Sequence, residues 1–332
     1  MTRLPLFLLV LGCPNTDGEK DAPGDTDTAA GVDSGNGEDC SVQMIAVSPN
    51  PDAVGVYYRD PIVLSFDGDG SSATWSLTAP DGSSPSLSAV WGDGNTMVTL
   101  SGTLAPSTTY TLVVDICGAQ PSLSFTTSSL GSFDLSPADL VDRTYSFALA
   151  DAEIIQPAVL EAFDDAKLIT PLGFMVQLAD ATSMELLGAV CEAQFGELVQ
   201  KSNTETWDFP AADFTAAPYF STDIDELTIV YEDSAAGVPR TDIVLYDFKF
   251  DGVFSADGSS IEHGAIDTLV DSRGLGPLFN LADTDDAVCT FAADFGVTCA
   301  DCPDGGPYCL HTIGVDIVAP WIEGLTLYPD AG

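Results

Sequence analysis

The chain has 332 residues, enough for two domains of ordinary size that each bury a hydrophobic core. It carries 51 acidic side chains against 9 basic ones, and the net charge of -42 excludes nucleic acid as a partner and disfavours anionic lipid surfaces. Because the acids are scattered along the chain, we interpret them mainly as a solvating surface. Calcium binding is the alternative, although no acidic stretch has the spacing of an EF-hand loop.

Residues 1–12 have the order of parts of a secretion signal, with one positive charge at Arg3 followed by an apolar run. The run is too short to span a bilayer, which takes about 20 apolar residues. It ends in Val-Leu-Gly-Cys at residues 10–13, which resembles the bacterial lipobox. The resemblance implies that Cys13 is acylated and anchors the chain in the cell envelope. Pro14 stands where an aspartate would resemble an inner-membrane retention signal, which favours the outer membrane, on either its periplasmic or its outer face.

The segment after the signal, residues 13–39, is acidic and nearly devoid of apolar side chains. It contains one branched apolar residue, Val32, and no aromatic residue. Such a composition cannot offset the entropy cost of ordering the backbone, so we expect a disordered tether. A flexible chain of this length reaches about 30 Å, which would hold the folded part near the membrane without fixing it there.

Residues 40–128 consist of short segments in which apolar and polar residues alternate, separated by turn residues such as Asp-Gly. This pattern predicts an antiparallel β-sandwich. The apolar residues that share a face in the two clearest strands are Ile62, Leu64 and Phe66 in one, and Tyr110, Leu112, Val114 and Ile116 in the other.

The sequence LAPSTTYTL at residues 104–112 resembles the L-x-P-x-T-x-Y stretch of bacterial Ig-like domains of the surface-layer (SbsA) type. The likeness extends from Pro49 to Phe125 and covers nearly the whole module. It implies an Ig-like sandwich in which Tyr110 hydrogen-bonds back to the preceding turn, a packing role and not a chemical one. It also implies a part in spacing, adhesion or display, and it brings no catalytic residue.

In the second module, residues 129–332, the predicted strands are longer. Alternating apolar residues predict strands at residues 145–149, 174–178, 227–231 and 313–317, and a hairpin with strands at 244–250 and 261–269. Short helices are predicted at residues 136–140, capped by Ser136, and 283–295, capped by Asp283. The chain is therefore expected to be mostly β, an Ig-like antiparallel β-sandwich followed by a larger α+β domain with a curved antiparallel sheet and a few short helices. The layout of this domain resembles uncharacterised envelope lipoproteins of Gram-negative bacteria, which implies no activity.

The clearest strand of the second module is expected to place four apolar side chains on one face: Val244, Tyr246, Phe248 and Phe250. This stripe has two interpretations. The first is an ordinary hydrophobic core, and the second is the lining of a cavity for lipid or another apolar ligand, as in half-barrel lipid carriers.

Seven cysteines remain besides Cys13: Cys40, Cys117, Cys191, Cys289, Cys299, Cys302 and Cys309. Disulfides are expected in an exported protein. Cys40 and Cys117 are candidates to pin the edge of the first module, and the last four residues, spaced C-x9-C-x2-C-x6-C, are predicted to form two disulfides. Zinc binding by four thiolates and a redox C-x2-C motif are the alternatives. Cys191 is left over, as a free thiol or as part of an intermolecular bridge.

The sequence contains no recognisable catalytic set. Its two histidines, His263 and His311, lie in predicted strands outside any H-E-x-x-H motif, and there is no G-x-S-x-G elbow and no phosphate-binding loop. We therefore expect no catalytic residues, no bound metal and no cofactor. The leading hypothesis is a non-catalytic envelope lipoprotein with an Ig-like spacer or adhesion module and a domain that binds a protein or glycan partner. The alternatives are a carrier of apolar ligands and a calcium-dependent surface adhesion protein.

Overall fold

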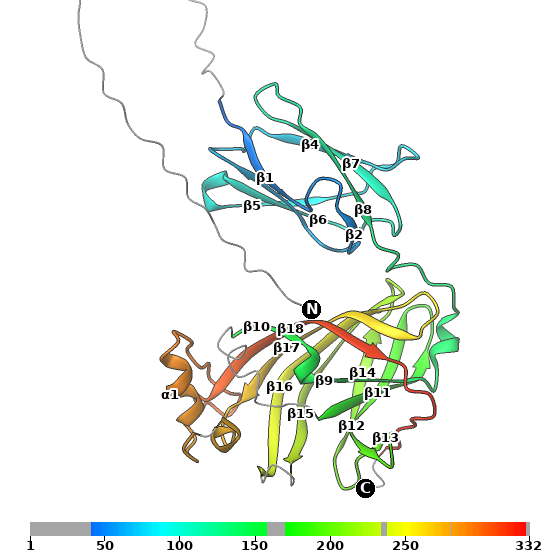
Figure 1. The fold of residues 1–332 in the computed structure, drawn as a ribbon, viewed down its shortest axis with the longest axis vertical. Helices are drawn as coiled ribbons and strands as arrows, with labels where there is room; N and C mark the ends of the chain where they lie inside the picture. Colours follow the sequence, from blue (N-terminus) through cyan, green and yellow to red (C-terminus); the bar gives the residue numbers. More distant parts are fainter. Residues whose placement is uncertain (1–40, 158–169, 234–237, 280, 330–332) are drawn as a thin grey trace, which may run out of the picture. The chain divides into compact units, whose positions relative to one another are not determined.

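The computed structural model describes residues 41–157, 170–233, 238–279 and 281–329 (Figure 1). The predicted signal, Cys13, the tether and Cys40 lie outside these ranges. Within the described ranges the chain is mostly β structure, as predicted, with one α-helix, α1 (Ala287–Ala293). None of the helices in the part that the structure covers is long and apolar enough to cross a membrane.

The first module is a β-sandwich of two four-stranded sheets. One sheet has the order β1 (Met44–Ser48), β3 (Ile62–Phe66), β6 (Met97–Ser101) and β5 (Ser88–Gly92). The other has the order β2 (Val54–Val56), β8 (Ser122–Thr127), β7 (Thr109–Asp115) and β4 (Thr74–Thr78). Strand pairs in both sheets are antiparallel except β2 with β8, which is parallel.

The alternation predicted for this module is present in its core. Ile62, Leu64 and Phe66 of β3 are buried, as are Tyr110 and its even-numbered successors in β7. The backbone N–H of Ala105 donates a 2.8 Å hydrogen bond to the Tyr110 hydroxyl. The tyrosine therefore ties the turn before β7 to the core of the sandwich, which is the packing role that the resemblance implies.

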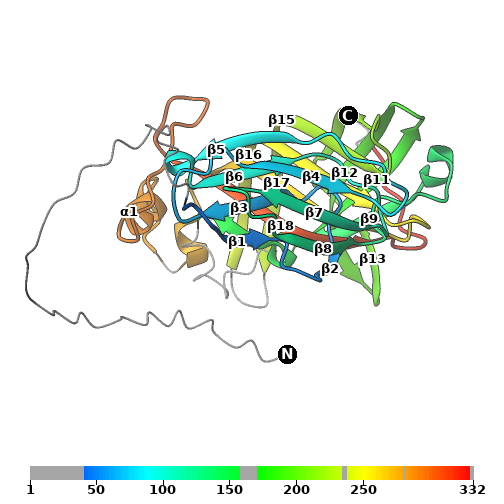
Figure 2. The ribbon, with the colours of Figure 1, turned by 90° about the horizontal axis from the view of Figure 1, so that it is seen from above.

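The second module is built on one ten-stranded antiparallel sheet that curves into a half-barrel (Figure 1), with α1 beyond one end of its long strands (Figure 2). Its strand order is β10 (Glu153–Gln156), β18 (Cys309–Pro320), β17 (Ser260–Asp271), β16 (Val238–Phe254), β15 (Tyr219–Asp233), β14 (Thr206–Asp213), β12 (Ser183–Gln194), β11 (Pro171–Ala179) and β9 (Thr144–Ala148), and β13 (Glu197–Gln200) pairs with β12. The predicted long hairpin is β16 and β17. At the other end of the curve, the N–H of Ile322 donates to the carbonyl of Thr144, which joins the chain after β18 to β9.

The inner face of the curved sheet is filled by a cluster of aromatic side chains. Its buried members are Tyr145, Phe147, Phe174, Phe209, Phe214, Phe220, Phe248, Phe250 and Phe254. Phe147 stacks on Phe174 with ring centroids 5.5 Å apart, and Phe174 lies 5.0 Å from Phe250. Contacts of this kind add about 0.5–1.5 kcal/mol per pair to the hydrophobic gain. The rings come from strands across the sheet and make its interior a packed core.

The expectation that Val244, Tyr246, Phe248 and Phe250 share one face is wrong. A β-bulge interrupts β16 at Asp247, whose φ is 49°. Before the bulge the odd-numbered residues of the strand are buried, and after it the even-numbered ones are. Because an inserted residue reverses the alternation, Phe248 and Phe250 lie in the core while Val244 and Tyr246 face the other way and stay partly exposed.

Bulges break two more predicted stripes in the same way. Leu178 of β11 follows a register shift after Val176 and is 52% exposed. In β18 the residue Asp316 has a φ of 57°, and Ile317 beyond it is fully buried whereas Val315 is not. These irregularities allow the long strands to bend, which a regular strand pair does not.

The first predicted helix lies where expected, after its cap Ser136, whereas the second is shorter than expected and follows Asp286 instead of Asp283. The first is a single 3-10 turn at Pro137–Leu140, in which the N–H of Ser136 donates to the carboxylate of Asp139. The second, α1, begins at Ala287 because residues 283–286 form a turn in which the Thr284 hydroxyl donates to Asp286. Its end precedes Gly296, whose positive φ of 78° takes the chain out of the helical conformation.

The outer face of β11 and β12 is covered by residues 322–329, which we call the C-terminal strap. Leu325 and Leu327 of the strap are buried in a separate cluster with Met175, Leu187 and Cys191. The buried hydroxyl of Thr144 donates a 2.8 Å hydrogen bond to the carbonyl of Leu325. The strap is thus held by apolar packing and by a hydrogen bond to the start of β9.

Candidate binding site

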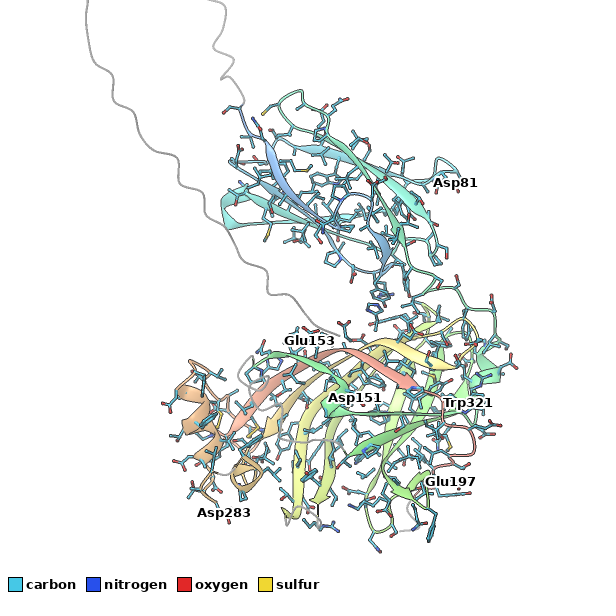
Figure 3. The ribbon with its side chains drawn as sticks, in the orientation of Figure 1. Asp81, Asp151, Glu153, Glu197, Asp283 and Trp321 are labelled. Atoms are coloured by element: carbon cyan, nitrogen blue, oxygen red, sulfur yellow. A yellow bond between two sulfur atoms is a disulfide. The ribbon has the colours of Figure 1, made fainter. Side chains whose placement is uncertain are left out.

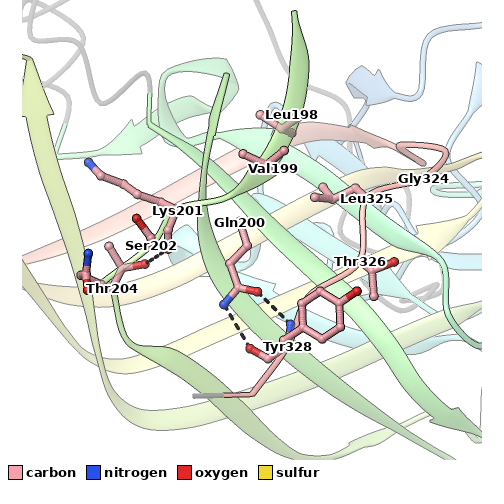
Figure 4. A pocket seen from close by; sticks show the side chains of 11 residues that line it. Leu198, Val199, Gln200, Lys201, Ser202, Thr204, Gly324, Leu325, Thr326 and Tyr328 are labelled. Carbon is pink, nitrogen blue, oxygen red and sulfur yellow. Dashed lines mark hydrogen bonds between the residues drawn. The ribbon is translucent and has the colours of Figure 1, made fainter. Parts of the chain in front are cut away.

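A crevice of about 380 Å³ lies between β13 and the C-terminal strap (Figure 4). One wall is residues 198–204, and the other is residues 324–326 together with Tyr328. The two walls are far apart in the sequence, so nothing in the pattern of either one predicts the crevice.

The first wall is fixed to the sheet by the β12–β13 hairpin. The N–H of Lys201 donates to the carbonyl of Val190, which extends the pairing of the two strands by one residue. The loop then turns at Asn203, whose φ is 58°, a conformation that asparagine tolerates better than most residues. The buried hydroxyl of Thr204 donates back to the Lys201 carbonyl and closes the turn.

The second wall is joined to the first by one side chain, Gln200. Its amide nitrogen donates to the carbonyl of Tyr328 over 3.1 Å, and its amide oxygen accepts from the Tyr328 N–H over 2.8 Å (Figure 4). A side-chain amide offers a donor and an acceptor, as a backbone peptide does. The Gln200 side chain therefore satisfies the N–H and the carbonyl of Tyr328 in the way that a residue of a paired strand would. This pair of bonds sets the width of the crevice.

The lining of the crevice combines the aliphatic side chains of Leu198, Val199 and Leu325 with polar ones, and it contains no carboxylate, in a chain with 51 acidic residues. Lys201 supplies the one cationic group, and Ser202, Asn203 and Thr326 supply exposed hydroxyl and amide groups. The Tyr328 side chain is 68% exposed beside them. An aromatic ring next to amide and hydroxyl groups combines an apolar surface with hydrogen-bonding capacity, which suits a polar ligand with apolar faces.

The tip of the same hairpin carries another exposed aromatic residue. Phe195 occupies the turn between β12 and β13 with a φ of 54°, and its side chain is fully exposed. The strand that begins two residues later leads into the crevice wall at Leu198. A large apolar side chain held in solvent at a turn gives no stability to the fold.

The predicted cysteine chemistry is confirmed in the C-terminal cluster, where two disulfides form. They join Cys289 to Cys299 and Cys302 to Cys309, with S–S distances of 2.01 and 2.09 Å. The zinc and redox-dithiol alternatives are not what the structure contains, because all four sulfurs are in disulfide bonds. Cys117 is disulfide-bonded as well, whereas Cys40 lies outside the described residues.

Cys191 is a buried free thiol in β12. Burial raises its pKa to about 12, because the thiolate would be desolvated in the apolar cluster beneath the strap. A thiol in this state is neither a nucleophile nor a metal ligand.

The two histidines have structural partners. The Nε2 atom of His311 lies 2.7 Å from the Asp267 carboxylate, and its Nδ1 atom lies 2.9 Å from the amide nitrogen of Gln156. Both ring nitrogens are therefore engaged, and the imidazole ties β18 to β17 and β10. His263 stacks in parallel on the ring of Tyr57, with centroids 4.4 Å apart.

A group of charged and aromatic residues that sequence reasoning missed lies where the first module meets β15–β17. We call it the module junction: Tyr57, Arg59, Tyr219, Asp251 and His263. The guanidinium of Arg59 lies 3.7 Å above the Tyr219 ring. Desolvation raises the pKa of Asp251 to about 6, although the positive charge of Arg59 opposes the shift. These residues are widely separated in the sequence and belong to no common motif, so the sequence could not predict that they lie together.

Many of the acids lie in turns and loops between the strands, as Asp81 and Asp283 do in Figure 3. In five Asp-x-Ser/Thr sequences the carboxylate accepts the backbone N–H two residues later: Asp69, Asp81, Asp180, Asp213 and Asp257. These hydrogen bonds lower the pKa of each of the five carboxyl groups. In the described ranges no three His, Cys, Asp or Glu side chains gather where they could hold a metal ion.

No protein-family model and no curated protein matches the chain. Among solved structures, CopC from Methylosinus trichosporium OB3b is similar to 26% of this chain and 93% of its own, with 15% identity and a TM-score of 0.24. The LD transpeptidase LdtMt1 in complex with imipenem is similar over 64% of this chain and 77% of its own, with 12% identity and a TM-score of 0.21. A DUF4784 family protein from Bacteroides caccae ATCC 43185 is similar over 70% of this chain and 80% of its own, with 11% identity and a TM-score of 0.21. Similarities this weak carry no argument about function.

Proposed function

We propose that the protein is a non-catalytic lipoprotein of the cell envelope. In this proposal Cys13 carries the lipid, residues 14–39 are the tether, the Ig-like module is a spacer, and the second module binds a partner on the envelope or the cell surface. The observation that carries the binding role is the crevice beside β13, because it joins the exposed ring of Tyr328 with polar side chains and no carboxylate in its lining. A chain of net charge -42 repels most anionic surfaces, and the exposed carboxylates of Glu197, Glu205 and Glu323 adjoin the lining residues in the chain, so the crevice favours a partner that is not anionic.

The architecture fits a rigid display platform. The cores of both modules are filled by side chains, and the strap and the hairpin that form the crevice are fixed by hydrogen bonds. Binding sites that sit on a rigid scaffold lose little entropy when the ligand binds.

The packing of the second module does not favour the carrier hypothesis. Phe248 and Phe250 are fully buried within the aromatic cluster, with Phe250 5.4 Å from Phe147 and 5.0 Å from Phe174. A lipid chain could enter this core only by displacing packed rings, which costs several kcal/mol for each ring. The calcium hypothesis gains no support from the five Asp turns, because their aspartates already accept hydrogen bonds from the backbone.

The anchoring part of the proposal is tested by metabolic labelling. The full chain is expressed in a Gram-negative host that is fed an alkyne-bearing palmitate, next to a Cys13→Ala variant. We expect the wild-type chain to carry the label and to be recovered in the outer-membrane fraction. The Cys13→Ala variant should be unlabelled and absent from that fraction. Equal labelling of both chains, or a wild-type chain found wholly in the soluble fraction, would contradict the proposal.

The binding part is tested with isolated envelopes. Purified full-length protein is incubated with cell envelopes of the host, and bound protein is measured by co-sedimentation while soluble fragments are followed by mass spectrometry. We expect saturable binding and no time-dependent release of fragments. Sustained release of fragments in proportion to protein concentration would show an enzyme and overturn the proposal, and so would a failure to sediment above a serum albumin control.

A further inference from the structure

We propose that the crevice between β13 and the C-terminal strap binds a neutral saccharide, with the Tyr328 ring against a face of the sugar and the loop of residues 201–203 at its hydroxyls. The inference rests on the proposed binding function, because it names the ligand class of the same site.

The ring of Tyr328 is presented in a fixed position. Within the strap, Leu325 and Leu327 point into the cluster against β11 and β12, and the alternation of the chain turns Thr326 and Tyr328 outward. The backbone of Tyr328 is held on both its N–H and its carbonyl by Gln200. The exposed aromatic face is therefore not a frayed end but a surface anchored at its base, and an anchored ring can stack on the C–H face of a sugar at little entropy cost.

Some polar side chains of the crevice make hydrogen bonds within the protein, and others are exposed to solvent, where they can meet a ligand. The amide of Gln200 and the hydroxyl of Thr204 make hydrogen bonds within the protein. Ser202 and Thr326 (Figure 4), together with Asn203, are exposed residues of the lining and offer hydroxyl and amide groups that can both donate and accept. Sugar hydroxyls also both donate and accept, so this set matches them better than a set of charged groups.

Charge decides between neutral and acidic sugars. Lys201 is the one cation in the lining, against a net charge of -42 for the chain. An acidic polysaccharide would meet repulsion along its whole length and attraction at one point, so the long-range field favours a neutral ligand. Lys201 then acts as a hydrogen-bond donor to a sugar oxygen. The volume of about 380 Å³ falls within the usual range of small-molecule sites.

The experiment is isothermal titration calorimetry of the full chain with defined probes. The neutral probes are oligomers of glucose, of galactose and of N-acetylglucosamine, and the acidic probe is oligogalacturonate. We expect at least one neutral probe to bind and the acidic probe to bind at least tenfold more weakly. Absence of binding by all the neutral probes at millimolar concentration, or tighter binding of the acidic probe, would overturn the inference.

Two variants locate the site. Tyr328→Ala and Asn203→Gly are each expected to weaken binding of the neutral probe by about tenfold; glycine keeps the positive φ of the turn at 203 and removes only the side-chain amide. Tyr328→Phe should retain most of the binding, because stacking needs the ring and not the hydroxyl. The matched control is Phe295→Ala, which removes another exposed aromatic ring, next to α1 and outside the crevice lining. Equal affinity of the wild type, Tyr328→Ala and Asn203→Gly would contradict the assignment to the crevice. If envelope binding persists in the co-sedimentation assay while no neutral saccharide binds, the proposed function stands and this inference fails.

Discussion

The side-chain amide of Gln200 holds the backbone of Tyr328, 128 residues further along the chain, through hydrogen bonds of 3.1 and 2.8 Å. The pair links the β12–β13 hairpin to the C-terminal strap. It therefore adds to the attachment that the apolar cluster and Thr144 give the strap, and it joins the two walls of the crevice.

Replacing Gln200 by leucine should loosen the strap. Both hydrogen bonds are lost, and we expect the free energy of unfolding to fall by about 1–2 kcal/mol. Gln200→Glu keeps an acceptor for the Tyr328 N–H but places a carboxylate oxygen against the Tyr328 carbonyl, so it should also loosen the strap. Urea denaturation measures the stability, and limited proteolysis reports the release of residues 322–329. Unchanged cleavage in Gln200→Leu would show that apolar packing alone holds the strap.

The Cys191 thiol should resist modification in the folded protein. Because burial raises its pKa to about 12, the reactive thiolate is nearly absent at neutral pH, and the strap covers the sulfur. Treatment with iodoacetamide should leave the Cys191 peptide unmodified under native conditions and alkylate it fully in guanidinium. Peptide mapping by mass spectrometry checks this, and rapid native alkylation would be contrary to the packing described.

Gly173→Ala should destabilise the second module through contact with Cys191. A Cβ atom at position 173 would lie 2.8 Å from the Cys191 sulfur, which is closer than van der Waals contact allows. It would lie 3.5 Å from the Leu327 side chain, which is an ordinary contact. We expect a loss of about 1–3 kcal/mol, as for other overpacked cores. The double variant with Cys191→Ala should recover part of that loss. A double-mutant cycle in urea measures the coupling, and additive effects would disprove the contact.

Asp251 should make the stability of the protein fall with rising pH. Its folded-state pKa of about 6 lies above the ordinary value of 3.8, so folding disfavours the ionised carboxylate. Below about pH 4 the carboxyl is protonated in both states and costs nothing, and the cost grows up to about pH 6 and is constant above it. We expect Asp251→Asn to gain stability relative to the wild type over this window, by about 1 kcal/mol after allowance for solvent screening. Urea denaturation at pH 4, 5, 6 and 7 checks the difference, and a pH-independent difference would contradict it.

Tyr110→Phe should destabilise the first module without altering its fold. The variant removes the acceptor of the Ala105 N–H and leaves that donor without a protein partner at the edge of the core. The expected cost is about 1–2 kcal/mol. Thr109→Val, at the exposed neighbouring position in β7, is the control and should have a smaller effect, since it loses only a surface hydrogen bond to Thr126. Equal stability of Tyr110→Phe and the wild type would rule out a structural role for the hydroxyl.

The local patterns of this sequence predicted its strands well because alternation is a local property. Ile62, Leu64 and Phe66 bury one face of β3, and the hairpin of β16 and β17 lies where alternating segments flank a turn. The clustering of four cysteines likewise predicted two disulfides, since residues so close in sequence remain close in the fold. The faces of the long strands were less predictable, because a single bulge residue such as Asp247 reverses the alternation and leaves no strong mark in the composition.

The sequence by itself therefore determined the mostly β class, the sandwich of the first module, the curved sheet of the second and the disulfide-rich loop. All of these follow from hydrophobic periodicity, turn chemistry and cysteine spacing, which act between near neighbours. Only the tertiary structure decided which residues form the crevice and the module junction, because Gln200 meets Tyr328 and Tyr57 meets His263 across large separations in the chain. Such meetings depend on the register and curvature of the whole sheet, and no short stretch of sequence encodes them.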